Sequence, residues 1–218
     1  MDAWAAVGAF GSIAAAGVAA WAAYQSRSSA QEANRAANTL AQIERDRRLT
    51  ELCPQLRVSC APIGSADYRG VFQLRLRLLG PLALGRLDQL TLAIRDDVHT
   101  RGDGQLTAGG PTRDQVKKQI WGSYRFTPGT GPDDARADLT GRETIYDAVL
   151  PVGEVLTFQM EPNPSPPWSS WTQEEWQQQQ GTVIRFAVVA TTGGVGSWRL
   201  VGDIDIGDLQ QRVEVNVP

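Results

Sequence analysis

Hydrophobic and polar positions divide the chain into three successive patterns, and the first is a long run without charge. Residues 3–24 read AWAAVGAFGSIAAAGVAAWAAY. At about 1.5 Å per residue, a helix of that length crosses a hydrocarbon core of about 30 Å. Trp4 stands at one end, and Trp21 and Tyr24 stand at the other, as aromatic residues do at the two membrane interfaces. The pattern predicts a transmembrane anchor over residues 1–24.

Two other interpretations of this run stay open. Alanine dominates it, so insertion into a bilayer gains little free energy, and the run could instead form a buried helix of a soluble core. A cleavable signal peptide would need basic residues ahead of the run, where Asp2 is the only side chain that ionises. We favour the uncleaved anchor.

Basic residues set the expected orientation of this anchor. Arg27 and Arg35 follow it closely, and no Lys or Arg precedes it. Basic residues near a membrane helix favour the cytoplasmic side. The sequence therefore predicts a single-pass protein of the cell membrane, with its amino terminus outside and its C-terminal domain in the cytoplasm.

Small side chains recur through the anchor and beyond it at alternating intervals of four and three residues. We call this series the small-residue stripe, and its members are Ala5, Ala9, Ser12, Ala16, Ala19, Ala23, Ser26, Ala30, Ala33, Ala37 and finally Leu40. Small residues let membrane helices approach closely, and Gly8 belongs to the same predicted contact segment. The stripe predicts a homo-oligomer of open subunit number, although a composition this rich in small residues can produce such a register by chance.

The second pattern predicts a helical stalk over residues 25–53. Residues 25–52 contain no Gly or Pro and are rich in Ala, Arg, Gln and Glu, which are good helix formers. Pro54 ends the pattern, because the residue before a proline is disfavoured in helical conformation. The stalk would continue the anchor helix up to the start of the third pattern.

In the third pattern, residues 54–218, apolar residues alternate with polar ones, as in half-buried antiparallel strands. The alternating sets are Leu56/Val58/Cys60, Leu74/Leu76/Leu78, Leu90/Leu92/Ile94, Leu156/Phe158/Met160, Ile184/Phe186/Val188 and Val213/Val215/Val217. Seven or eight short strands predict a mainly β fold of the immunoglobulin-like sandwich type.

Two short helices are expected to interrupt this β domain. Thr112 and Thr172 each begin a capping box, and the helical runs after them reach Gly122 and Gly181. The connecting segments, residues 98–111, 128–145 and 161–171, are rich in Gly, Pro and Asp and are expected to be long loops.

Candidate chemistry is sparse, and we expect no catalytic residue, cofactor or metal. His99 is the only histidine, and Cys53 and Cys60 are too few for structural zinc. The net charge of −3 disfavours nucleic acid as a partner. Arg75 and Arg77, together with Arg57, are expected to keep an outer sheet face soluble.

Three tryptophans form the strongest candidate for a contact with a protein partner. Trp168, Trp171 and Trp176 surround the proline-rich run Pro162–Pro167 and the second short helix. Aromatic residues held by prolines can form a rigid recognition surface. They can equally form an apolar plug at one end of the sandwich, which we favour.

Several phrases of the β domain resemble a group of uncharacterised actinobacterial proteins with a membrane helix, an Ala/Arg-rich stalk and a C-terminal β domain. The phrases are LDQLTLAIRDD (residues 87–97), AGGPT (residues 108–112), IWGSYRFTPG (residues 120–129) and EPNPSPPW (residues 161–168). The resemblance spans most of residues 55–190 and implies the same three-part organisation, but no activity, ligand or catalytic residue.

Together these patterns predict a membrane-anchored protein that self-associates through its N-terminal helix and presents a cytosolic β-sandwich. The β domain would act as a binding or scaffolding module for an unknown protein partner, and membrane lipid would surround the anchor. The alternative is an oligomeric membrane effector or pore, because close packing of small residues suits that assembly equally well.

Overall fold

The computed structural model describes residues 3–63, 70–96, 110–131, 135–207 and 213–217. Its described side chains leave out residues 3–20, 22, 23, 135 and 213–216, which lie within helices and strands. The chain divides into two compact units, Met1–Thr50 and Glu51–Pro218, and each is considered by itself.

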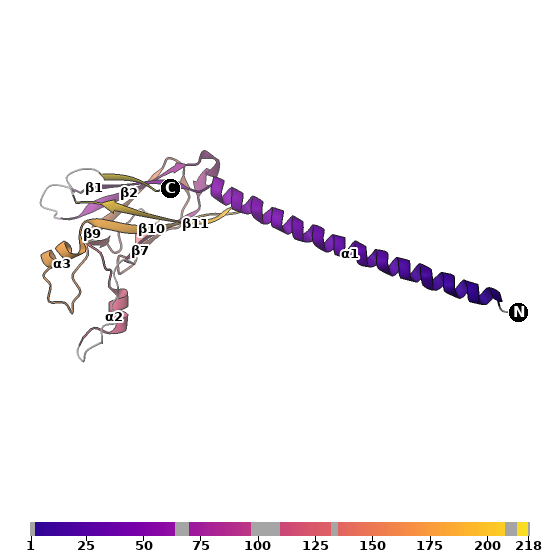
Figure 1. The fold of residues 1–218 in the computed structure, drawn as a ribbon. Coiled ribbons are helices and arrows are strands. Elements are labelled where there is room, and N and C mark those ends of the chain that lie inside the picture. Colours follow the sequence, from indigo (N-terminus) through magenta and orange to yellow (C-terminus); the bar gives the residue numbers. More distant parts are fainter. Residues whose placement is uncertain (1–2, 64–69, 97–109, 132–134, 208–212, 218) are drawn as a thin grey trace. The chain divides into compact units, whose positions relative to one another are not determined.

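The first unit is one continuous helix, α1 (Ala3–Glu51), as predicted for the stalk (Figure 1). Between Tyr24 and Thr50 every side chain is exposed apart from the half-buried Ser28 and Leu49. Local contacts include an ion pair of 3.3 Å between Arg48 Nε and Glu44 Oε1. The helix therefore presents nearly its whole described surface for contact with something outside the unit.

The predicted anchor falls mostly outside the described side chains. Trp21 and Tyr24 are described, and both are exposed. Within the part of the chain that the structure describes, no helix combines the length and the apolar character that a membrane crossing requires. The predicted residues whose side chains are not described are Trp4, Ala5, Gly8, Ala9, Ser12, Ala16, Ala19 and Ala23.

The second unit, which we call the β domain, is mainly β-sheet, and its strands pair antiparallel. One five-stranded sheet, the first sheet, has the order β12 (Val213–Val217), β1 (Gln55–Pro62), β2 (Phe72–Gly80), β9 (Val155–Pro162), β5 (Tyr124–Phe126). The other, the second sheet, has the order β11 (Gly196–Asp205), β10 (Val183–Thr192), β4 (Gln89–Ile94), β7 (Glu143–Tyr146), β6 (Ala135–Ala137). A small third sheet pairs β3 (Arg86–Leu87) with β8 (Leu150–Pro151), next to the short helix η1 (Leu82–Leu84).

Each five-stranded sheet buries one of its two faces. In β2, Leu74, Leu76 and Leu78 are buried, whereas Arg75 and Arg77 between them point to the opposite face. The same alternation holds in β1, β4, β9 and β10, which confirms the predicted period-two pattern. The core therefore consists of the apolar set of each strand, as the sequence predicts.

Both capping boxes are present, but one of the two predicted helix ends is wrong. α2 (Arg113–Lys118) begins at Thr112 and α3 (Gln173–Gln180) at Thr172, and each threonine accepts from the third residue of its helix. α3 ends at Gly181 as predicted, with a positive φ of 74°. α2 instead ends before Gly122, because Gln119 is extended and Ile120 is buried in the core.

The segment 128–145 was expected to be a loop and instead contributes to the second sheet. β6 lies wholly within it, and β7 begins within it and pairs with β4. Only Thr144 and Tyr146 of β7 are inward-facing and buried. Strands this short depend on backbone hydrogen bonds to a neighbouring strand. They contain too few residues to show a clear alternation of apolar and polar side chains in the sequence.

We expect truncation of Leu76 to weaken the β domain strongly. Leu76→Ala removes a fully buried side chain from the centre of β2, so the free energy of unfolding should fall by about 2–5 kcal/mol. Val155→Ala is the matched control on the neighbouring strand β9 of the same sheet, where the valine side chain is exposed. Chemical denaturation measures both, and equal losses would contradict the assignment of the core.

Candidate functional site

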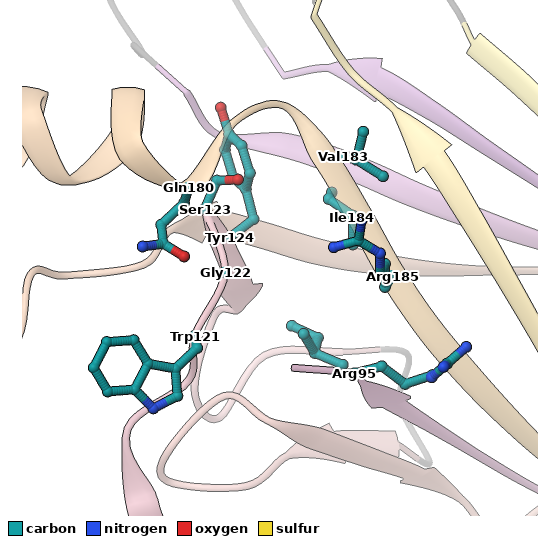
Figure 2. A pocket seen from close by; sticks show the side chains of 10 residues that line it. Arg95, Trp121, Gly122, Ser123, Tyr124, Gln180, Val183, Ile184 and Arg185 are labelled. Carbon is teal, nitrogen blue, oxygen red and sulfur yellow. The ribbon is translucent and has the colours of Figure 1, made fainter. Parts of the chain in front are cut away.

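A small hollow lies where the ends of β4 and β10 meet the segments that carry β5 and α3. It encloses about 20 Å³, which is room for little more than a water molecule. Figure 2 shows Trp121 and Gln180 on one side and Arg95 and Arg185 on the other. The remaining lining residues are Ile94, Gly122, Ser123, Tyr124, Val183 and Ile184.

The arginine side of the hollow is built by two neighbouring strands. The backbone N–H of Arg95, directly after β4, donates to the carbonyl of Arg185 in β10 at 2.9 Å. Ile94 and Ile184 before them are buried, so strand alternation turns both arginines outward. Arg185 Nε lies 3.8 Å from Asp203 Oδ2, and such a long, partly exposed ion pair stabilises little.

The opposite side of the hollow offers polar groups and an aromatic ring. Gln180 Oε1 is buried without a hydrogen-bond partner, whereas the Ser123 hydroxyl donates to the Gly181 carbonyl. Burial raises the pKa of Tyr124 above its usual value, which keeps its phenol neutral. A buried acceptor without a donor costs free energy, so Gln180 favours a ligand that brings an N–H or O–H group.

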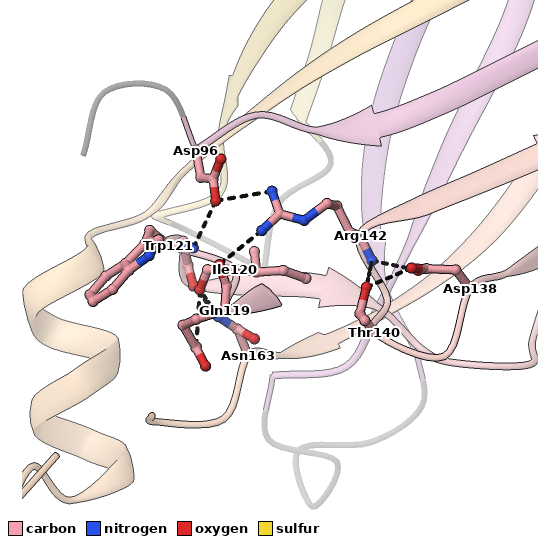
Figure 3. A network of polar contacts seen from close by, with 9 residues as sticks. Asp96, Gln119, Ile120, Trp121, Asp138, Thr140, Arg142 and Asn163 are labelled. Atoms are coloured by element: carbon pink, nitrogen blue, oxygen red, sulfur yellow. Dashed lines mark hydrogen bonds and ion pairs between the residues drawn. The ribbon is translucent and has the colours of Figure 1, made fainter. Parts of the chain in front are cut away.

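A network of polar contacts clamps residues 119–122 beside the hollow (Figure 3). Arg142 Nη1 lies 3.0 Å from Asp96 Oδ2, and its Nη2 donates to the Gln119 carbonyl at 2.8 Å. Asn163 Nδ2 donates to the carbonyls of Ile120 and Gly122 at 2.6 and 2.9 Å. Trp121, between these two carbonyls, is thereby held at the wall of the hollow.

The predicted tryptophan cluster continues from this wall, with Trp176 at its centre. Trp176 is fully buried, and its ring centre lies 5.8 Å from that of Trp121 and 5.6 Å from that of Trp171. Trp171 exposes 40% of its surface, and Trp168 is half-buried. Of the three predicted contact residues, Trp168 and Trp171 thus keep a surface for a partner, whereas Trp176 fills the end of the core.

The other candidate groups form no reactive site in the described residues. Burial raises the pKa of Cys60 to about 12, so its thiol stays protonated and unreactive. Cys53 is a half-buried free thiol, and His99 lies outside the described residues. No group of metal-ligating side chains occurs in the described part of the chain.

The predicted arginine stripe lies on the outward face of the first sheet. Arg57 and Arg77 stand directly opposite each other in the register of β1 and β2. Arg77 Nε donates to the Gly153 carbonyl at 3.1 Å, and Arg75 Nη2 to Gln73 Oε1 at 2.9 Å. These contacts fit the predicted role of a solvated sheet face.

The sequence does not single out the residues that form the hollow. Arg95 and Arg185 occupy ordinary outward positions after buried isoleucines, and Trp121 and Gln180 belong to inserted segments. The alternating pattern predicts the outward direction of each arginine. Their pairing depends on the register of β4 against β10, which residues far apart in the chain determine together.

Comparison of the chain with models of protein families, with curated proteins and with solved structures finds no match. The guanidinium group of Arg185, the buried amide oxygen of Gln180 and the indole ring of Trp121 suit non-covalent recognition of a small polar group at the hollow.

Acid is expected to weaken the polar network through Asp138. Burial opposes its ionisation, but hydrogen bonds from the Thr140 hydroxyl and from the backbone N–H groups of Glu143, Arg142 and Thr140 outweigh it and hold the pKa of Asp138 below 3.8. The stabilisation is complete above that usual value and is lost as the pH falls through the lowered pKa. Chemical denaturation between about pH 6 and about pH 3 should therefore show a smaller loss of stability in Asp138→Asn than in the native chain.

Two threonine variants separate this effect from general acid unfolding. Thr140→Val removes a hydroxyl that donates to Asp138 Oδ2 at 2.6 Å and should also flatten the pH dependence. Thr130→Val is the control, because that hydroxyl donates to a backbone carbonyl. The same pH dependence in all four proteins would contradict the role of Asp138.

Proposed function

We propose that the protein is a membrane-tethered, self-associating binding protein whose immunoglobulin-like β domain holds a protein partner in the cytoplasm. The observation that carries this proposal is the exposure of α1 along its described length. The β domain supplies the binding surface, and the helix supplies several copies of it. Weak contacts of single copies would then add up, because linked sites raise the effective concentration of each other.

The order of the strands supports an immunoglobulin-like sandwich. β1, β2 and β9 are adjacent in the first sheet, and β11, β10, β4 and β7 are adjacent in the second. In chain order, β1 and β2 lie in the first sheet, β4 and β7 in the second, β9 in the first again, and β10 and β11 in the second. This order resembles that of strands A, B, C, C′, E, F and G in the immunoglobulin fold. Each sheet also buries one apolar face, and two such faces are most readily buried against each other.

Exposure of α1 supports self-association. Leu40 exposes 66% of its surface and Ile43 is also exposed, whereas helices in proteins gain most of their stability from packing one face. Leu40 ends the small-residue stripe, which would bring the backbones of two copies close together. We propose that other copies of the chain supply the packing that α1 lacks.

The uncharged run at residues 3–24 supports the tether. Copies anchored in one bilayer by their amino termini can associate only in parallel, so that the same residues of each helix meet at the seam. This arrangement would hold every β domain at the same distance along the helix from the membrane. The proposal therefore joins the stripe, the anchor and the binding domain in one assembly.

Acidic residues within the stripe should dissociate the assembly. The double variant Ala33→Glu/Leu40→Glu places like charges at the seam between parallel helices, where they repel each other. Sedimentation of the full chain in a mild detergent should show an oligomer for the native protein and a monomer for this variant.

The control carries the same two charges on the opposite side of the helix. Ser28→Glu/Gln42→Glu adds equal charge outside the stripe and should leave the oligomer intact. A monomeric native chain would refute self-association, and equal dissociation by both double variants would refute the stripe as the contact surface.

A further inference from the structure

We infer that the hollow, together with the outward face of the second sheet, binds an acidic side chain that a protein partner presents among apolar residues. The inference rests on the proposed binding function and names its contact surface and the chemistry of its partner. We call the surface the acid-binding face. It consists of Arg95, Arg185 and Gln180 at the hollow and of Val189, Val201 and Ile145 on the sheet.

The sheet part of this face is unusually apolar for an outward surface. Val201 in β11 stands opposite Ala187 in β10, which stands opposite Ala93 in β4. In the next row, Val189 stands opposite Thr91, and Thr91 opposite Ile145. Exposed faces of antiparallel sheets are commonly polar, and a contiguous apolar patch marks a contact site.

Exposure shows that these side chains are accessible to a partner. Val201, Ile145 and Val189 expose 50%, 45% and 36% of their surfaces. Between them lie the small side chains of Ala93, which is half-buried, and Ala187, which exposes 6% of its surface, so contact with a partner depends on the three larger side chains. The patch spans four neighbouring strands of the second sheet, β11, β10, β4 and β7.

Two arginines lie directly beside this patch, with Asp203 opposite Arg185 and Glu143 opposite Ala93 as the neighbouring acidic residues. Arg185 is two residues from Ala187 on the same side of β10, and Arg95 is two residues from Ala93 on the same side of the neighbouring chain segment. Guanidinium groups present several donors in one plane, which match the two oxygens of a carboxylate. The patch and the arginines together are complementary to an acidic residue with apolar neighbours.

The size of the hollow restricts the ligand to a single functional group. Sites for cofactors and other small molecules usually enclose about 300–1,000 Å³, whereas this hollow encloses about 20 Å³. A carboxylate that projects from a larger molecule fits this limit, and an entire metabolite does not. The ligand is therefore part of a macromolecule that also covers the apolar patch.

Gln180 indicates that this macromolecule is a protein. Its buried Oε1 has no hydrogen-bond partner and accepts only from a donor. A carboxylate has no such donor when ionised, but the backbone N–H groups of a peptide next to an acidic residue provide one. One peptide segment can thus satisfy both the arginines and the amide oxygen.

Paired peptides test the inference directly. The probes are short acetylated peptides with a central Glu among Val and Leu residues, each with a counterpart in which Gln replaces the Glu. Binding to the full chain in a mild detergent is followed by tryptophan fluorescence. The native chain should bind Glu peptides about ten-fold more tightly than their Gln counterparts, because hydrogen bonds to charged groups are the stronger ones.

Variants of the two arginines should abolish this preference, and a matched arginine should not. Arg185→Gln removes a guanidinium group at the hollow, and Arg95→Gln removes the guanidinium group of its neighbour. Arg77→Gln is the control, because Arg77 is an exposed outward arginine of the first sheet, away from the acid-binding face. Val201→Asp should weaken the binding of every peptide through the apolar patch.

Four results would overturn the inference. The first three are equal binding of Glu and Gln peptides by the native chain, an unchanged preference in both arginine variants, and loss of the preference in Arg77→Gln alone. In the fourth result, the native chain binds no peptide, and Arg185→Gln sediments with a lower mass than the native chain. This result would show that another copy of the chain occupies the face.

The monomeric stripe variant separates this inference from the proposed assembly. Ala33→Glu/Leu40→Glu should keep the preference for Glu peptides, since the face lies within the β domain. Failure of self-association appears in the sedimentation mass, whereas failure of the acid-binding face appears in the ratio of the two peptide affinities.

Discussion

Burial of one apolar face by each five-stranded sheet is the constraint on which the β domain depends. Both sheets bury leucine side chains, namely Leu74, Leu76 and Leu78 on one sheet and Leu90 and Leu92 on the other. Burial of such apolar side chains is the dominant favourable term in the free energy of folding. Because side chains alternate along a strand, this burial also determines which residues point outward. The positions of Arg185, Val189 and Val201 follow from it.

The candidate site arises where the regular sheet ends and the inserted segments begin. Asn163 and Arg142 hold residues 119–122 there through hydrogen bonds to their carbonyls. The Asn163 carbonyl in turn accepts from the side chains of Gln173 and Gln177 in α3. Trp176 fills the space beneath them and contacts Trp121. The same polar and aromatic contacts that close this end of the domain thereby leave a small hollow between the two arginines and the amide of Gln180.

Much of this architecture could be predicted from local patterns. Period-two alternation identified the long strands, and threonine capping boxes identified the starts of α2 and α3. The alternating pattern did not predict β6 and β7, because strands of so few residues depend on backbone pairing with a neighbouring strand. The hollow could not be predicted, because Arg95 and Arg185 become neighbours only through the pairing of β4 with β10. The sequence near either residue does not determine that pairing.

Self-association of α1 is the central claim, because it gives the exposed helix a partner and multiplies the binding domain. Oxidative cross-linking of the full chain tests it most directly, with one cysteine introduced at Leu40 or at Gln42 in a Cys53→Ser background, where the remaining Cys60 is buried. Parallel association through the stripe predicts rapid disulfide formation between copies at position 40 and little at position 42. Equally slow cross-linking at both positions would contradict the account.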